Sequence, residues 1–325
     1  MTDPIIQLDP AQFKPHSIHT GERCWAETNC YVDVVIELVH SLGYEPVAAL
    51  PMTVSIDFEL DQWTFFKFAH IDLMKMFGME IQELNPWRAL VGHIEEQVHG
   101  GRPVLVEVDS CYLPDTAGTV YHSAHVKSTI AVNEIDIAKK TLGYFHGQGY
   151  FELGEKDFTD IFQLDGLAHD RLLPPYIEIV KLHDHARSIS TRKLADMSVS
   201  ALKRQILMLP KDNPFIKFKH KFEDDLGWLL NDSIELFHDY SFATLRQYGA
   251  CFELAATYTS WLSDNSDHEL SKVTANYLTI ANVAKTLQFR LARSVARRKA
   301  LDLAPLDEMA VLWKENADRL ANTFC

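Results

Sequence analysis

The hydrophobic pattern changes its period along this chain, and the change limits the available folds more than any other feature. Apolar residues first recur at helical spacing, in three stretches: 31–42, 71–77 and 87–99. Four short β-rich runs follow: 103–109, 125–132, 141–145 and 150–153. Residues 133–140 are expected to connect two of these strands as a hairpin. Helices followed by antiparallel strands predict an α+β first half.

The pattern changes again after Pro174-Pro175. The remaining chain is predicted to be mostly helical, with five helices: 198–209, 213–239, 242–262, 271–300 and 306–323. A chain of 325 residues exceeds the usual size of one domain. We therefore expect two domains, a catalytic α+β domain over 1–185 and a helical domain over 186–325.

Composition excludes several classes of function. The net charge of −14 argues against general nucleic-acid binding, which requires a basic surface. Five cysteines without a CxxC pair indicate reduced thiols and not a disulfide framework. No signal peptide and no apolar run long enough to span a bilayer are recognisable. We expect a soluble, cytoplasmic protein with no membrane partner.

Cys30 is the candidate nucleophile. It stands at the start of the first amphipathic helix, where unpaired backbone N–H groups and the helix dipole favour a thiolate and can receive a developing oxyanion. The alternative is a buried cysteine that packs under a helix start. Cys24 is the rival nucleophile, but it lacks a helix start. The other three cysteines have no comparable context.

His125 is the candidate base because it directly precedes a predicted strand. A structural hydrogen bond at a strand end is the alternative. A third residue usually orients the imidazole of such a base, and three candidates are Asp109, Asn133 and His146.

Two further residues precede Cys30 in the sequence. Glu27 and Asn29 are candidates for supporting the oxyanion, although Asn29 equally suits the role of helix cap.

Five segments resemble an uncharacterised bacterial family defined by a domain of unknown function. They are WAETNCYVD (25–33), DQWTFFK (61–67), EVDSCYLPDT (107–116), HVKSTIAVNEID (125–136) and RQYGACFEL (246–254). The resemblance spans most of the chain. It implies a genomic neighbourhood with amino acid:carrier-protein ligases, and hence an acyl or aminoacyl carrier protein as partner.

The first half is more distantly similar to butirosin-type acyltransferases and to double-glycine leader peptidases, which are papain-like. The shared pattern is a helix-opening cysteine, a strand that ends in Asp109 before Tyr-Leu-Pro, and a strand led by His125. Those families show Asp-Pro after the next strand, where this chain has His146-Gly147. The similarity therefore implies a papain-like domain with a Cys–His dyad or a substitute third residue.

The leading functional hypothesis is an acyl- or aminoacyltransferase. An acyl group would pass from a phosphopantetheine thioester on a carrier protein to Cys30, and then to a small-molecule or peptide amine. No diffusible cofactor is required. An intracellular cysteine peptidase or amidase, and a non-catalytic binding protein that retains the fold, are the alternatives.

Three further features bear on binding roles. Arg290, Arg293 and Arg297 share one helical face and suit an acidic carrier protein or a phosphate, although an ordinary solvated face is the alternative. The aromatic run 63–68 is expected to be core, with the wall of a hydrophobic acyl pocket as the alternative. The histidine pairs 122/125 and 183/185 lack further ligands, so no metal site is expected.

Overall fold

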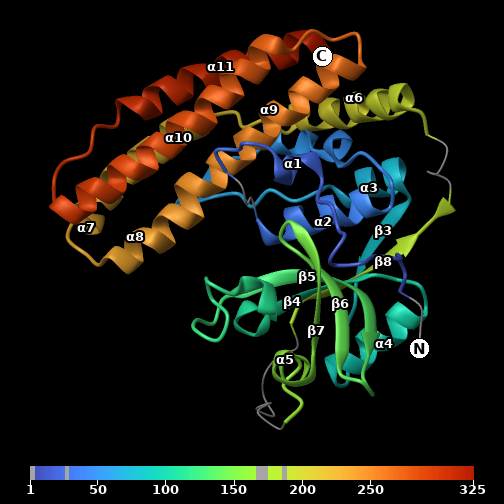
Figure 1. Cartoon of the computed structure of the whole chain (residues 1–325). Helices are drawn as coiled ribbons and strands as arrows, with labels where there is room; N and C mark the ends of the chain where they lie inside the picture. Colours follow the sequence, from blue (N-terminus) through green and yellow to red (C-terminus); the bar gives the residue numbers. More distant parts are fainter. Residues whose placement is uncertain (1–3, 26–28, 166–174, 185–188) are drawn as a thin grey trace. The chain divides into compact units, whose positions relative to one another are not determined.

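The computed structural model describes residues 4–25, 29–165, 175–184 and 189–325. The chain forms two compact units, and neither is a continuous segment. Unit 1 comprises residues 1–21, 29–46 and 70–188, and unit 2 comprises residues 22–28, 47–69 and 189–325. Each unit has its own layers of secondary structure (Figure 1).

Unit 1 is built on a six-stranded sheet in the order β3-β8-β4-β5-β6-β7, with every neighbouring pair antiparallel. The strands are β3 (Met79–Glu83), β4 (Val104–Asp109), β5 (Lys127–Asp136), β6 (Thr141–His146), β7 (Gly149–Gly154) and β8 (Ile177–Leu182). Strands β4 to β7 follow one another in the chain, whereas β8 inserts between β3 and β4. The sheet thus joins segments about a hundred residues apart in sequence.

Helices cover both faces of this sheet (Figure 1). Helix α2 (Cys30–Ser41) packs on β5 and β6, while α4 (Leu90–His99) and α5 (Glu155–Ile161) contribute Ile94 and Phe158 to the core on the other face. That core also takes the alternating side chains of β4 and β5, such as Val106 and Ile130. The alternation makes the other side chains of these strands face α2.

Helix α2 is buried along most of its length, and it carries two acidic side chains inward. Glu37 and Asp33 have side chains that are 0% and 3% exposed. Both contact the buried ring of His19 in α1 (Ser17–Thr20), Glu37 at Nδ1 and Asp33 at Nε2. Burial alone would lower the pKa of His19, but these hydrogen bonds and charges outweigh it and raise the pKa to about 9. A protonated imidazole therefore offsets the two carboxylates.

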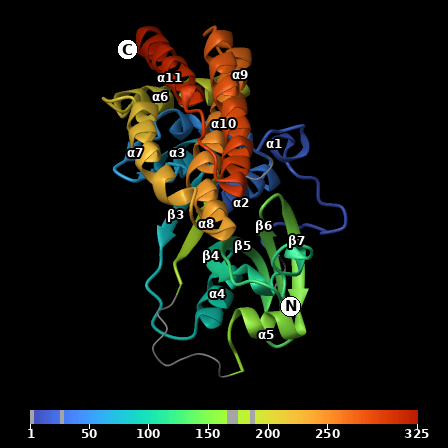
Figure 2. The same cartoon turned by 90° about the vertical axis from the view of Figure 1, so that its left-hand side faces the viewer.

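Unit 2 is mostly helical (Figure 2). Its longer helices are α6 (Thr191–Leu207), α7 (Pro214–Leu229), α8 (Ile234–Ser241), α9 (Gln247–Asn265), α10 (Ser271–Arg297) and α11 (Ala304–Phe324). Trp25 joins this unit by packing directly on Gly249 of α9, where any Cβ would collide with the indole. Among the described residues, no helix has the length and apolarity to cross a bilayer.

The predicted α+β first half and helical second half are confirmed. Three details differ from the sequence analysis, which missed β3 and β8. Strand β5 continues to Asp136, so the hairpin connection is shorter than 133–140. The helix expected over 213–239 is interrupted after Leu229 and resumes at Ile234.

Candidate functional site

Cys30 is the first residue of α2, directly after the cap of the helix. Asn29 has an extended backbone, and its Oδ1 accepts a hydrogen bond from the N–H of Val32 at 2.8 Å. The thiol of Cys30 is half-buried and donates to Oγ1 of Thr129 at 3.4 Å. The start of α2 is thereby held against β5.

His125 and Asp109 form a close pair. Nδ1 of His125 lies 2.6 Å from Oδ2 of Asp109, with side chains that are 72% and 32% exposed. Oδ1 of Asp109 accepts the backbone N–H of Cys111 at 3.0 Å, which fixes the carboxylate at the end of β4. The carboxylate orients the imidazole and leaves the rest of the ring open to solvent.

The pleat of the sheet relates this pair to Cys30. Asp109 stands opposite Lys127 in the β4–β5 ladder, and Glu107 stands opposite Thr129. Because Thr129 contacts Cys30, this face of both strands is the face that α2 covers. Within the described parts of the chain, no hydrogen bond joins Cys30 to His125. Asp109 and the contact point of Cys30 therefore share one sheet face, two residues apart along β5.

The same face carries a buried carboxylate that the sequence did not indicate. Glu178 of β8 is fully buried. Its Oε1 accepts a hydrogen bond from the hydroxyl of Tyr176 at 2.7 Å. Nε2 of His70 lies 3.6 Å from Glu178 and 3.2 Å from the hydroxyl of Tyr31, the residue after Cys30. Burial, followed by the charge of Glu178, raises the pKa of Tyr31, so this hydroxyl remains protonated. Polar groups thus line the sheet beneath the start of α2.

The other two candidates for a third residue are engaged elsewhere. Asn133 is fully buried and bonds the backbone of Ile6 and the hydroxyl of Tyr150. Nδ1 of His146 donates to Oδ2 of Asp115 at 2.5 Å, and its Nε2 lies 2.7 Å from Oγ of Ser128.

The bonds of His146 form a Ser–His–Asp series on the opposite sheet face. Tyr144 also donates to Asp115 at 2.5 Å. Ser128 is 7% exposed. These bonds tie the turn η4 (Pro114–Thr116), which contains Asp115, to β6. The turn precedes the segment that leads to His125.

Of the two proposed oxyanion residues, Asn29 serves as the helix cap, and Glu27 lies outside the described residues. Cys24 lacks an activating environment: burial, then the negative charge of Glu253, raises the pKa of its thiol despite a smaller opposing effect of Lys285. Burial also raises the pKa of Cys251 far above its ordinary value.

Cys111 is a site residue that the sequence analysis missed. One ligand atom each of Asp109, Cys111 and His125 lies within 4.8 Å of the others. The spacing of Asp109 and Cys111, two residues apart, was visible in the sequence. Its meaning depends on the tight turn η3 (Ser110–Tyr112), which turns the thiol back towards the end of β4.

Of the two histidine pairs, 122/125 and 183/185, only His125 belongs to such a group among the described residues. Nε2 of His122 lies 3.5 Å from Asp157, and Nε2 of His183 lies 2.8 Å from Glu80. His185 lies outside the described residues.

In unit 2, Arg290, Arg293 and Arg297 are exposed along α10. They make no ion pair within the part of the chain that the structure describes. The aromatic run is core, as expected: Trp63, Phe66 and Phe68 are at most 5% exposed, and only Phe65 projects.

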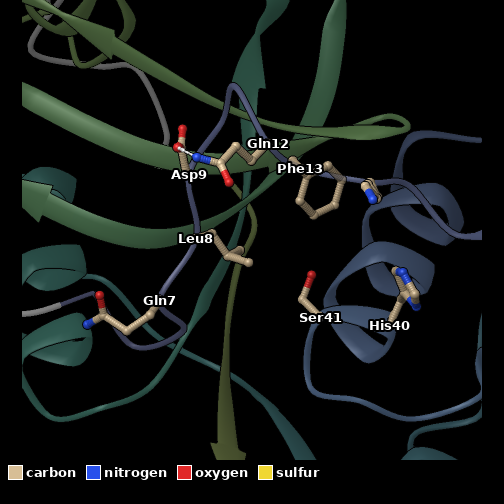
Figure 3. A pocket seen from close by; sticks show the side chains of 8 residues that line it. Gln7, Leu8, Asp9, Gln12, Phe13, His40 and Ser41 are labelled. Carbon is tan, nitrogen blue, oxygen red and sulfur yellow. Dashed lines mark hydrogen bonds between the residues drawn. The ribbon is translucent and has the colours of Figure 1, made fainter.

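A pocket of about 400 Å³ lies at the other end of α2 from Cys30 (Figure 3). His40 and Ser41 line it from the helix, facing Leu8 and Phe13 of the N-terminal segment. None of the candidate catalytic residues lines this pocket. The candidate site therefore lies outside this pocket, at the start of α2.

Residues 14–182 match the model of the DUF1839 N-terminal domain, and residues 191–322 match that of the DUF1839 C-terminal domain. The chain belongs to the DUF1839 family. No curated protein is similar enough to match. In this DUF1839 chain, the N-terminal match contains Cys30, Asp109 and His125, and the C-terminal match contains the exposed arginines of α10.

Proposed function

We propose that unit 1 is a papain-like catalytic domain and that the chain is an acyl- or aminoacyltransferase with Cys30 as nucleophile. The observation that carries the proposal is the 2.6 Å contact of Asp109 with His125, an exposed imidazole held by a carboxylate. The position of Cys30 as the first residue of α2 supports it. The similarity of the first half to butirosin-type acyltransferases supplies the reaction class.

The reaction has two steps. In the first, Cys30 attacks the thioester carbonyl of a loaded carrier protein, and a new S–C bond replaces the bond to the phosphopantetheine sulfur, which leaves as a thiol with the proton from Cys30. In the second, an amine attacks the acyl group on Cys30. His125 removes the proton of the attacking nitrogen, the C–S bond to Cys30 breaks, and the proton passes from His125 to the departing thiolate. Backbone N–H groups at the start of α2 stabilise the oxyanion in both steps.

In the absence of substrate, the thiol of Cys30 is hydrogen-bonded to Thr129 and must be released before it can react. Catalytic hydrogen bonds are often formed only in the substrate complex. We infer that a bound thioester displaces the contact between Cys30 and Thr129 and that the exposed ring of His125 moves towards the sulfur.

The arginines of α10 provide the partner surface in this proposal. Their exposed side chains, free of ion pairs within the described chain, suit an acidic carrier protein or its prosthetic-group phosphate. This face is positively charged, although the chain as a whole carries a net charge of −14.

One observation favours a second function. The 72% exposure of the His125 side chain admits water to the base, which suits a cysteine peptidase or amidase that transfers the acyl group to water. The contact of Cys30 with Thr129 is the observation that favours the third reading, a non-catalytic binding protein.

A mass measurement tests these functions. Wild type, Cys30→Ala and the matched control Cys24→Ala are incubated with acyl- and aminoacyl-loaded carrier proteins and analysed by intact mass. Transfer predicts an adduct in wild type and in Cys24→Ala but not in Cys30→Ala. It also predicts that amines discharge this adduct faster than water does. Discharge by water alone would favour the hydrolase. No adduct, with a Cys30 no more reactive than a model thiol, would favour the binding protein.

A further inference from the structure

Three side chains converge where β4 ends, and the proposed function uses only two of them. Asp109 closes β4, Cys111 lies in η3, and His125 lies in the segment that leads into β5. Their ligand atoms lie within 4.8 Å of one another. We propose that these three residues bind Zn²⁺ and that the bound metal inhibits the chemistry of Cys30 by occupying His125. The inhibitory role rests on the proposed function, whereas the metal site does not.

The donor set selects the metal. A thiolate and an imidazole suit zinc, whereas magnesium and calcium require oxygen donors. Zinc bonds of about 2.0–2.3 Å in a tetrahedral site place donors about 3.5 Å apart, so separations near the 4.8 Å limit must close by about 1 Å, while the 2.6 Å contact of His125 with Asp109 must open. The 72% exposed side chain of His125 has the freedom to do this. Three protein ligands leave the fourth position to water.

The surroundings of the three donors prepare the site. The backbone N–H of Cys111 holds Oδ1 of Asp109 at 3.0 Å, so Oδ2 is directed at His125. Such outer contacts fix the orientation of metal ligands. Cys111 is 6% exposed and His125 lies open, so the thiol forms the floor of the site and the imidazole its solvent side.

Charge and protons balance on binding. The carboxylate and the thiolate together neutralise the two charges of the cation, and the imidazole binds as the neutral ring. The Cys111 thiol loses one proton to the solvent as the S–Zn bond forms. Zinc bound to both His125 and Asp109 replaces their hydrogen bond. An imidazole held in this way has no nitrogen lone pair available to take a proton from a substrate amine or from Cys30.

Zinc binding is measured first, without any activity. Metal-free wild type, Cys111→Ser and the matched control Cys251→Ser are titrated with Zn²⁺ against a chromophoric chelator. The proposal expects one ion per chain in wild type and Cys251→Ser, and at least 10-fold weaker binding in Cys111→Ser. Cobalt(II) substitution should give a thiolate-to-metal absorption band that Cys111→Ser lacks. Equal zinc affinity in all three proteins, or no thiolate band, would overturn the site.

The inhibitory role is tested by the rate at which iodoacetamide alkylates Cys30. For each protein, the rate with zinc is divided by the rate without zinc. Zinc should slow wild type and Cys251→Ser at least 10-fold and leave the ratio for Cys111→Ser near one. If zinc binds but metal-free Cys30 is no faster than a model thiol, the proposed function fails and the metal site stands. If Cys30 is reactive and zinc leaves its rate unchanged, the inhibition fails and the proposed function stands.

Discussion

The thiol of Cys30 lies 3.4 Å from the hydroxyl of Thr129 and hydrogen-bonds it across the interface between α2 and β5. A hydroxyl both accepts from a thiol and donates to a thiolate, and hydrogen bonds to a charged group are the stronger ones. The hydroxyl of Thr129 can therefore stay bonded to Cys30 in either state, as an acceptor from the thiol or as a donor to a thiolate.

Replacing Thr129 tests this relationship. Thr129→Val should slow alkylation of Cys30 by iodoacetamide about 5-fold, because a charge-assisted hydrogen bond worth about 1 kcal/mol is lost. Thr129→Ser keeps the hydroxyl and should react at the rate of wild type. Equal rates in the valine and serine variants would show that the hydroxyl has no effect on the thiolate.

Removing the charge of Asp109 tests its role in orienting His125. Asp109→Asn should slow aminolysis of the acyl-Cys30 adduct on the order of 10³-fold, since the amide favours the wrong tautomer of the imidazole. Glu107→Gln alters the neighbouring carboxylate on the same sheet face and should stay within about 3-fold of wild type. Quenched-flow mass spectrometry of the preformed adduct gives both rates. A similar loss in the two variants would assign the effect to general charge.

Charge reversal tests the basic face of α10. Arg290→Glu, Arg293→Glu and Arg297→Glu together should raise the KM for loaded carrier protein on the order of 10-fold or more and remove its dependence on salt. The exposed pair Lys203→Glu and Lys211→Glu is the control and should change KM little. A KM that responds equally to both sets of changes would exclude a specific docking surface.

The pKa of His19 predicts how stability depends on pH. The folded chain raises this pKa from 6.5 to about 9. The shift contributes on the order of 3 kcal/mol to the free energy of unfolding. Because the folded value is the higher one, this contribution is complete below pH 6.5 and is lost as the pH rises through about 9.

Urea unfolding of wild type and His19→Gln at several pH values measures this contribution. The difference between their free energies of unfolding should be largest near pH 6.5 and shrink by pH 9.5. A difference that stays constant over this range would mean that His19 is not protonated between Asp33 and Glu37.

Asp115 anchors its turn to β6, and its removal should cost stability. Asp115→Ala leaves Tyr144 and His146 without their acceptor at a side chain that is 6% exposed, so about 2–4 kcal/mol should be lost. Asp136→Ala removes a more exposed carboxylate, paired with Lys139, and should cost clearly less than Asp115→Ala. Both values come from urea unfolding followed by tryptophan fluorescence. Equal losses would contradict the anchoring role.

Local patterns in the sequence were sufficient to predict the order of the elements and the helix that begins at Cys30. They failed where pairing depends on distant segments. Strands β3 and β8 are short, pair with each other across about a hundred residues, and have no hairpin turn that would indicate them.

The candidate site shows the same limit. Asp109 was one of three candidates to orient His125, and the choice depended on which side chains the pleat brings to one face. Cys111 was missed because the tight turn after β4 is a feature of three-dimensional structure. The roles of Cys30, His125 and the arginines remain predictions.

The discontinuous make-up of the two units has a consequence for how the chain can be divided and synthesised. A cut near residue 185 looks natural from the sequence, yet it would separate residues 22–25 and 47–69 from the rest of unit 2. During synthesis, β3 must also wait for β8 to leave the ribosome before it gains a neighbour in the sheet. We therefore expect the two halves to fold together, either as one polypeptide or as two fragments that are mixed with each other.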